Sequence, residues 1–486
     1  MKRYILTLIF VMTTAVGFSQ HKHEVRAAWL TTLKSLDWPR NSGTDKQTEM
    51  KQKAELIQQL DELKRAKFNT IIFQTRMRAD LAYPSYLEPF HYAIVGSPAT
   101  GRPTYDPLRF VIEECHKRGM ECHAWIVTLP LGDKAHIKKQ GKASVLNKLK
   151  PMTISHRGAY YLNPADARTK QYLMRVVEEI VYNYDIDGIH LDYMRYPDKA
   201  NMLNDSKEYK AKSRGEKHED WRRNNITNIL RHIYKGVKDI KPWVKVSVCP
   251  IGKYSDTSRY SSKGWNAYRT VSQDVELWLK EGIVDQIYPM IYFKNNDFFP
   301  FVLQWQELSR GRHIVPGLGV YFLDPREGRW QIEDIEKQIN FIRRHSVSGV
   351  GYYRTEFVLN NSKGLYDKLI NQYNQSETII PAISWIDSVP PAKPSFLKAE
   401  SIKEGYVKLS WGESVDNDSR NKPKYVVYAS NNFPVDTSDA RNIVATNVVG
   451  TDFVFSPTYI WNERKYFAVT AIDRYGNESE PTQSSL

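Results

Sequence analysis

The segment DARTKQYLMRVVEEIVYNYDIDGIHLDYMRYP (residues 166–197) predicts a helix followed directly by a strand. Apolar residues in its first part recur at helical spacing, whereas IDGIHLD (186–192) is a short apolar run typical of a buried strand. The same succession of helix and strand repeats on both sides of this segment, from Glu24 to about Tyr373. Alternation of this kind predicts an α/β fold in which helices cover a parallel sheet.

The number of predicted strands favours a barrel over an open sheet. Strands are predicted over residues 25–32, 68–76, 120–128, 186–197 (with its exit loop), 244–252, 284–293, 313–321 and 347–358. Helices are predicted over residues 53–67, 107–119, 166–184, 221–240, 271–282, 332–345 and 365–373. Eight strands, each followed by a helix or a long excursion, are what a (β/α)₈ TIM barrel needs. An open doubly wound sheet is disfavoured because no glycine-rich phosphate loop follows the first strand.

The last part of the chain has a different character. Residues 381–394 contain four prolines, which is a linker composition, and short strands are then predicted at 406–411, 424–430, 453–456 and 465–473. This region resembles a fibronectin type III module, with Trp411 and Tyr466 in the core of a two-sheet sandwich. We therefore expect a barrel over residues 21–380, a Pro-rich linker over 381–394 and a small all-β sandwich over 395–486.

The first twenty residues predict export. Met1–Arg3 form a basic start, residues 4–16 are largely apolar, and small residues follow at 17–19. This pattern is typical of a cleaved secretory signal peptide (1–20), and no other stretch is long and apolar enough to span a bilayer. We expect a soluble protein of the periplasm or extracellular space, without a lipid anchor because no cysteine lies near the cut. Its three cysteines do not indicate a disulfide framework.

The composition gives weak information about the ligand. The chain has 69 Lys and Arg against 55 Asp and Glu, a net charge of +14, but no long basic run. A spread positive charge is compatible with an anionic polymer and is weak evidence for nucleic acid. The 12 Trp, 30 Tyr and 18 Phe exclude a disordered chain and are compatible with a surface that stacks on sugar rings.

The candidate site residues are those at the C-terminal ends of the strands, where (β/α)₈ barrels carry their reactive groups. Asp192 ends the fourth strand, so a catalytic role is favoured over an ion pair with Arg195 or Arg76. Glycosidic hydrolysis needs a second carboxyl group, which Glu356, Asp80 or Asp324 could supply. Glu356 is expected at the exit of strand eight, on one face with Tyr352 and Arg354, and its alternative role is an ion pair with Arg354. The catalytic candidates are Asp192, Glu356 and Asp80. The substrate-binding candidates are Arg76, His123, Trp125, His190, Arg195, Tyr292 and Asp324.

Five motifs in order resemble one known family. They are RAAWLTTLKSLDWP (26–39), FNTIIFQTRMRADLAYPS (68–85), ECHAW (121–125), DGIHLDYMRYP (187–197) and EGIVDQIYPMIYF (281–293). Together they resemble the glycosyl-hydrolase-like family ten of bacterial envelopes. The resemblance implies a (β/α)₈ barrel that acts on glycans, with peptidoglycan strands as the substrate of bacterial examples. It places family positions on Asp192, Arg76, Asp80, His123 and Trp125.

The chain also departs from related patterns. Many family members carry a second acid where Tyr193 follows Asp192, and a glutamine where this chain has Met290. The chitinase family-eighteen signature D-G-x-D-x-D-x-E resembles DGIHLDYM, but Met194 stands at its catalytic glutamate. The chitinase mechanism through that glutamate is therefore not available.

Three hypotheses remain open. The first is a secreted glycoside hydrolase that cleaves a bacterial polysaccharide, peptidoglycan above all, by carboxylate acid/base chemistry. The second is a non-catalytic glycan-binding barrel of the cell envelope. The third, metal-dependent hydrolysis through His190, Asp192 and His123, ranks last. We therefore predict no cofactor, no metal and no nucleic-acid partner, and the oligomeric state stays open.

Overall fold

The computed structural model describes residues 21–97, 101–256, 264–403, 406–418, 420, 422–456 and 465–485. The predicted signal peptide lies outside these residues. Within them, no helix has the length and apolar character needed to cross a membrane.

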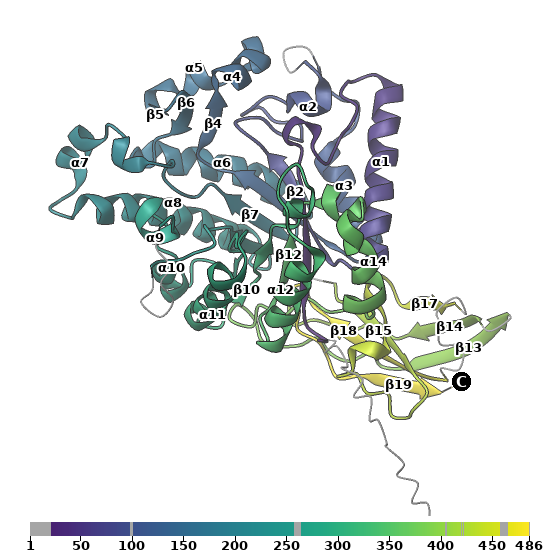
Figure 1. Ribbon diagram of the computed structural model, residues 1–486. Coiled ribbons are helices and arrows are strands. Elements are labelled where there is room, and N and C mark those ends of the chain that lie inside the picture. The colour runs from purple at the N-terminus through teal and green to yellow at the C-terminus, as the bar shows by residue number, and fades with distance from the viewer. Residues whose placement is uncertain are drawn as a thin grey trace, which may run out of the picture.

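The larger part of the molecule is built on a nine-stranded parallel sheet with a barrel-like form (Figure 1). Its order is β10-β9-β8-β7-β3-β2-β1-β12-β11. The strands are β1 (Val25–Leu30), β2 (Thr70–Arg76), β3 (Glu121–Val127), β7 (Gly188–Asp192), β8 (Lys245–Val248), β9 (Gln286–Ile287), β10 (His313–Ile314), β11 (Gly317–Leu318) and β12 (Gly349–Tyr352). These strands confirm the eight predicted segments, because β10 and β11 are two pieces of the seventh. Pro316, which has no N–H to donate, lies between the two pieces.

Helices follow the strands and cover the sheet. The longer ones are α1 (Lys46–Arg65), α3 (Pro107–Lys117), α6 (Ala167–Asn183), α8 (His218–Ile240), α11 (Phe299–Leu308) and α12 (Ile332–Arg344). Shorter ones are α2 (Tyr92–Val95), α4 (Lys134–Gln140), α5 (Leu146–Leu149), α7 (Ser206–Lys212), α9 (Ala267–Thr270), α10 (Val275–Glu281), α13 (Thr355–Leu359) and α14 (Leu365–Lys368). The predicted start of α3 is confirmed, since the Asp106 side chain accepts from Arg109 N and Pro107 opens the helix.

The eighth strand is shorter than predicted, and this changes the position of Glu356. Strand β12 ends at Tyr352, and Glu356 lies in the first turn of α13 rather than at a strand exit. The Asp37 carboxylate accepts the backbone N–H of Glu356 at 3.0 Å and an Arg354 N–H at 2.6 Å. An acceptor for a free N–H favours the start of a helix. The prediction that Glu356 belongs to the strand was therefore wrong.

An excursion that the sequence did not predict lies between β3 and α6. It is a three-stranded antiparallel sheet of β4 (Pro130–Asp133), β5 (Thr153–His156) and β6 (Ala159–Leu162), in the order β4-β6-β5. Strands β5 and β6 are joined by Arg157 and Gly158, both with positive φ, as a tight hairpin turn requires. Because it follows β3, the excursion rises from the C-terminal end of the parallel strands.

The C-terminal part forms two separate antiparallel sheets. One has the order β13-β14-β17 and the other β16-β15-β18-β19. Their strands are β13 (Leu397–Lys403), β14 (Tyr406–Trp411), β15 (Lys424–Ser430), β16 (Ile443–Val448), β17 (Asp452–Phe455), β18 (Tyr466–Ile472) and β19 (Thr482–Ser485). Strands β14, β15, β17 and β18 match the predicted segments, whereas β13, β16 and β19 were not predicted. Trp411 packs in the cluster between the sheets, as expected, and Tyr466 is half-buried.

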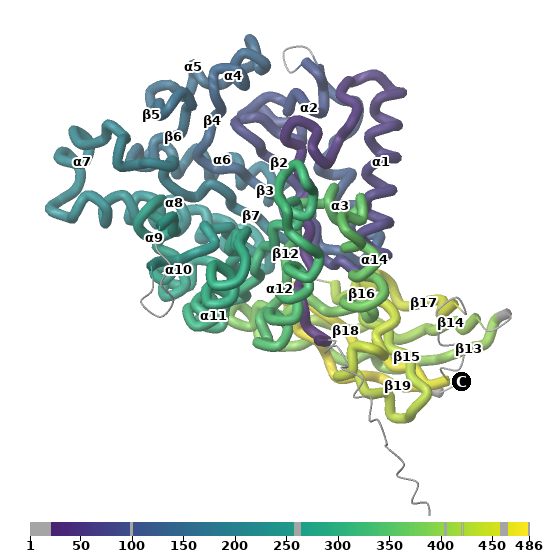
Figure 2. The backbone as a smooth tube through the Cα atoms, viewed as in Figure 1, coloured from purple at the N-terminus to yellow at the C-terminus, as the bar shows by residue number. Residues whose placement is uncertain are grey.

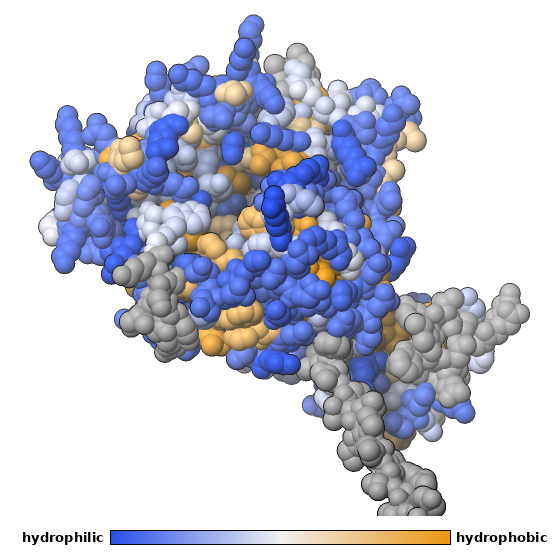
Figure 3. Space-filling model, viewed as in Figure 1, coloured by the Kyte–Doolittle hydropathy of each residue, from blue (hydrophilic) through white to orange (hydrophobic). Residues whose placement is uncertain are grey.

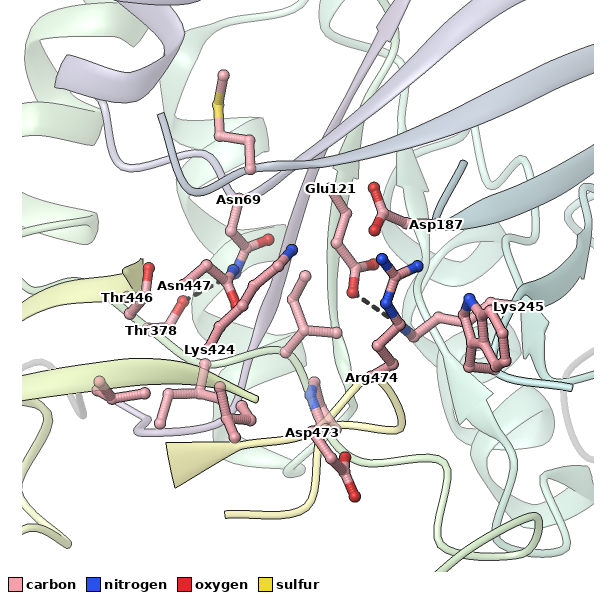
Figure 4. A pocket seen from close by; sticks show the side chains of 18 of the residues that line it. Asn69, Glu121, Asp187, Lys245, Thr378, Lys424, Thr446, Asn447, Asp473 and Arg474 are labelled. Carbon is pink, nitrogen blue, oxygen red and sulfur yellow. Dashed lines mark hydrogen bonds and ion pairs between the residues drawn. The ribbon is translucent and has the colours of Figure 1, made fainter. Parts of the chain in front are cut away.

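These sheets pack against the N-terminal ends of the parallel strands. The start of β1 lies beside them in both backbone views (Figures 1 and 2), and Lys22 pairs with Glu478 at 2.6 Å. Arg474 donates to Asp185 at 2.6 Å, and Asn447 donates to the Gly119 carbonyl at 2.9 Å. A small polar cavity of about 50 Å³ lies in this junction (Figure 4). The junction thus joins the two parts through charged and polar contacts.

Acid should weaken the fold through Glu24, which is buried beside β1. Burial raises the pKa of Glu24, but ion pairs with Arg343 and Arg26 outweigh this and lower it from 4.5 to about 2. A depressed pKa stabilises the fold above the unfolded-state pKa, and that contribution is lost as pH falls from 4.5 toward 2. We expect a loss of roughly 3 kcal/mol in the free energy of unfolding. Chemical denaturation of the parent and Glu24→Gln should show that the difference between their free energies of unfolding becomes smaller as pH falls from 4.5 toward 2. A difference that does not change with pH would contradict the prediction.

Candidate functional site

A cavity of about 440 Å³ lies at the C-terminal ends of the parallel strands, and aromatic side chains form most of its wall. We call it the aromatic cavity. It is lined by Trp29, Trp125, Asp192, Tyr193, Arg195, Cys249, Ile251, Trp265, Met290, Tyr292, Phe293, Tyr321, Phe322 and Tyr353. Hydrophobic surface gathers near the middle of the face in Figure 3, within a hydrophilic surround. Aromatic faces and a few polar groups are suited to a sugar, which stacks its apolar face on a ring.

Asp192 is the carboxylate of this cavity. It is the last residue of β7, and its side chain is buried. Its Oδ1 accepts the N–H of Tyr193 at 2.7 Å, and its Oδ2 accepts the indole N–H of Trp125 at 3.1 Å. Burial raises the pKa of Asp192, although the Cys249 thiol, Arg195 and the two N–H donors oppose the rise. A carboxyl group in this setting retains a proton more readily than one in water, as a general acid requires.

The aromatic side chains that form the cavity wall pack against one another. Tyr292 and Tyr353 stack with centroids 5.4 Å apart and an angle of 22° between their planes. Trp29 packs edge-on against Tyr353 and donates its indole N–H to His190 at 3.2 Å. Its six-membered ring would clash with any side chain at position 351, where a Cβ would lie 2.6 Å from it. Gly351 therefore makes room for the floor of the cavity.

Four of the residues predicted from sequence meet in this cavity. They are Asp192, Trp125, Arg195 and Tyr292. Arg195 donates to Asp198 at 2.6 Å, and its guanidinium lies over the ring of Tyr193. The ion pair considered for Asp192 is not formed with either candidate, because Arg195 binds Asp198 and Arg76 binds Glu88.

His190 and His123 are buried inside the sheet and do not line the cavity. Burial lowers the pKa of His190 well below its usual value. Its Nε2 accepts from Trp29, so the neutral ring donates from Nδ1 to Ser247 Oγ at 2.8 Å. His123 bonds to Glu121 at 2.9 Å. In the part of the chain that the structure describes, no group of three or more His, Cys, Asp or Glu side chains is placed to hold a metal ion.

Arg76 is the last residue of β2 and Asp80 lies in the loop that follows, and neither is exposed. Arg76 forms two bonds to Glu88, at 2.6 and 2.7 Å, and also donates to the Thr128 carbonyl at 2.8 Å. Asp80 accepts from His91 at 3.0 Å and lies 3.4 Å from His136. These contacts stabilise the loop after β2, and neither side chain lines the aromatic cavity.

Glu356 and Asp324 are also outside the lining. Glu356 pairs with Arg354 at 2.7 Å, which is the ion pair considered as its alternative role. Asp324 binds its neighbour Arg326 at 2.7 Å, and these hydrogen bonds lower its pKa to about 2. Among the described residues, Asp192 is thus the single carboxylate in the wall of the aromatic cavity.

Several wall residues were missed, and one of them could have been found. Tyr353 lines the cavity, whereas Tyr352 is buried against Phe68 on the helix side of the sheet. Tyr352, which was predicted on one face with Arg354 and Glu356, is therefore not part of the cavity wall. In β7 the apolar Ile189 and Leu191 alternate with His190 and Asp192, and the same alternation in β12 places Val350 and Tyr352 on the outward face. Trp265 comes from a loop, and Tyr321 and Phe322 come from a short 3₁₀ helix (Val320–Leu323); neither element has a periodic signal that would mark them.

Comparison with known proteins agrees with this geometry. A family model described as glycosyl hydrolase-like 10 matches residues 24–318, more than half of the chain. The chain belongs to this family. The glycosyl hydrolase-like 10 match spans the strands from β1 to β11, including the four predicted residues that meet in the cavity. Tyr193 and Met290, at which the sequence analysis expected departures from the family pattern, both line the cavity.

Two curated relatives are similar over long stretches. Glycosyl hydrolase YngK of Bacillus subtilis is 27% identical over 512 aligned positions, covering 99% of this chain and 98% of that protein. Glycosyl hydrolase DigH of Escherichia coli is 28% identical over 294 positions, covering 56% of this chain and 66% of that protein.

Among solved structures, the glycoside hydrolase domain of PgaB (BpsB) from Bordetella bronchiseptica aligns with a TM-score of 0.48 and 13% identity. The alignment covers 71% of this chain and 98% of that domain.

Proposed function

We propose that this protein is an exported glycoside hydrolase that cleaves glycosidic bonds in a bacterial polysaccharide, with peptidoglycan glycan strands as its substrate. The observation that carries the proposal is Asp192, a buried carboxyl group of raised pKa at the end of β7, in a wall of aromatic rings. Asp192 protonates the leaving oxygen, while the rings hold the sugars on either side of the bond. Membership of the glycosyl hydrolase-like 10 family supports a glycan as the ligand.

One observation favours a second candidate, a glycan-binding barrel without catalysis. Two carboxyl groups usually flank the bond that a glycosidase cleaves. Among the described residues, Asp192 is the only carboxylate that lines the aromatic cavity. Tyr193 follows it at the position where the family resemblance leads us to expect a second acid. A hydrolase with this wall takes its second group from a loop that closes on the substrate, or from the substrate itself. A binding protein needs neither.

The wider architecture belongs to the same proposal. The seventh strand pairs with β9 through His313–Ile314 and with β12 through Gly317–Leu318, which supports a closed (β/α)₈ barrel. The three-plus-four arrangement of the C-terminal sheets supports a fibronectin type III-like module that acts as a spacer or docking element. Residues 1–20 serve as the signal peptide, which directs the protein to the cell envelope or beyond.

Product release distinguishes the two candidates. The purified protein is incubated with peptidoglycan, intact and stripped of its stem peptides, and new reducing ends and pelleted protein are both measured. New reducing ends establish the hydrolase and its polymer together. Co-sedimentation with the glycan without new reducing ends establishes the binding protein. Absence of both overturns the peptidoglycan proposal.

A further inference from the structure

A second cavity adjoins the aromatic cavity on the side of the β4-β6-β5 excursion. We call it the side cavity. It has a volume of about 240 Å³ and is lined by Pro130, His156, Arg157, Tyr161, Tyr193, Arg195, Tyr196, Pro197 and Asp198. Tyr193 and Arg195 belong to both linings, so the two cavities lie on either side of these residues. A polymer bound in the aromatic cavity can extend into the side cavity with its next sugar.

The two cavities differ in charge. The aromatic cavity holds Asp192 and Arg195 among mainly aromatic residues. The side cavity brings in a second arginine, Arg157, and its one acid, Asp198, is neutralised by Arg195 at 2.6 Å. His156 donates from Nε2 to the Asp198 carbonyl at 2.9 Å, as the neutral ring can. The side cavity therefore carries a net positive charge that suits an anionic group.

One N–H donor of Arg195 has no acceptor among the described residues. Its side chain is more than nine-tenths buried, and its guanidinium lies over the rings of Tyr193 and Trp265 at 4.6 and 5.7 Å. Its Nη1 donates to Asp198, but its buried Nε has no hydrogen-bond partner among the described residues. A buried donor without a partner costs free energy, and a bound acceptor that shifts the side chain slightly would recover it. The fixed guanidinium plane is suited to the two oxygens of a carboxylate.

Arg157 supplies the second cation of the side cavity. It occupies the turn between β5 and β6 with φ +50°, and its side chain is exposed. In the part of the chain that the structure describes, it forms no ion pair. The turn thus holds an uncommitted arginine at the rim of the side cavity.

We infer that the side cavity is a subsite for a sugar that bears a free carboxylate, which Arg195 and Arg157 bind while a neighbouring sugar stacks in the aromatic cavity. This inference rests on the proposed function and names the chemistry of its substrate: a glycan in which an acidic sugar adjoins the one at Asp192. Neutral glycans would leave Arg157 without a counter-charge and the buried Nε of Arg195 without a charged acceptor.

Binding tests the subsite independently of turnover. The Asp192→Asn protein is titrated calorimetrically with an oligosaccharide of alternating N-acetylglucosamine and N-acetylmuramic acid, and with the same oligosaccharide after its carboxyl groups are methyl-esterified. We expect the free acid to bind about tenfold more tightly than the ester, the effect of one charge-assisted hydrogen bond. Adding Arg157→Asn should reduce this difference, because it removes one of the two arginines that bind the carboxylate. Asparagine suits the positive φ of the turn, so the hairpin is preserved.

Arg344, an exposed arginine in the last turn of α12, provides the matched control. Arg344→Ala removes the same charge far from the site and should leave both dissociation constants unchanged. Equal binding of acid and ester, an equal loss of both in Arg157→Asn, or no binding of either would overturn the inference. Reducing ends from the parent protein are measured in parallel. If the acid binds more tightly but is not cleaved, the hydrolase proposal fails while the subsite stands.

Discussion

Asp192→Asn should lower kcat/KM on the cleaved glycan by about a thousandfold or more. The loss of one general acid typically lowers the rate by about 10²–10⁴-fold. Asparagine has nearly the same shape, and its single carbonyl oxygen can still accept one of the two N–H groups that Asp192 accepts, from Trp125 or from Tyr193. It carries no proton for the leaving oxygen. The measurement is the initial rate of reducing-end release by the parent and the variant at equal concentrations.

The pH dependence of the parent enzyme provides an independent check on this role. A general acid must be protonated, so the rate should fall as pH rises through the pKa of Asp192. Because burial raises that pKa, this fall should occur at a higher pH than for an exposed aspartate. The thermal unfolding of Asp192→Asn should match the parent, which ensures that lost activity is not lost structure. An Asp192→Asn protein that retains its activity would exclude the assignment.

Arg76→Met should destabilise the fold by about 3–5 kcal/mol, the usual cost of removing one partner of a buried ion pair. Arg76 is fully buried with Glu88, and Tyr172 donates to the same carboxylate at 2.8 Å. Without the guanidinium, Glu88 is left as an uncompensated charge in the interior. Urea denaturation of the parent and the variant measures the effect.

A double variant separates this structural role from substrate binding. Arg76→Met combined with Glu88→Gln removes both charges, and the introduced amide oxygen can still accept from Tyr172. We expect the double variant to recover part of the lost stability. If Arg76 instead bound substrate, as the sequence analysis predicted, the single variant would keep its stability and show a raised KM. That result would restore Arg76 to the site.

Much of the parallel sheet could be predicted because its strands are buried runs bounded by helices with clear periodicity. The lengths of the sixth and seventh strands could not be predicted, since the structure reduces them to β9, β10 and β11, each two residues long. Strand β13, which was not predicted, is a mostly polar edge strand without such a period. The helical position of Glu356 depends on the Asp37 carboxylate, which lies more than 300 residues away in sequence. Contacts of that kind leave no local pattern.

The candidate site likewise contains residues that could be placed from the sequence and residues that could not. Asp192 could be placed because it ends β7, and Trp125 because it lies near the end of β3. Arg76 and Asp80 satisfy the same rule by position, yet their partners Glu88 and His91 turn them into the interior. Polar residues after a strand are therefore ambiguous from sequence, since either a ligand or a buried counter-charge explains them.

The C-terminal sheets pack on the N-terminal ends of the parallel strands, whereas the aromatic cavity lies at the C-terminal ends of the same strands. Strands β15, β18 and β19 lie at the end remote from the aromatic cavity, because parallel strands separate their two ends across the length of the sheet. An affinity tag or a surface linkage attached beyond β19 therefore leaves the mouth facing bulk solution. Protein immobilised in this orientation can be presented to an insoluble polymer without its support obstructing access.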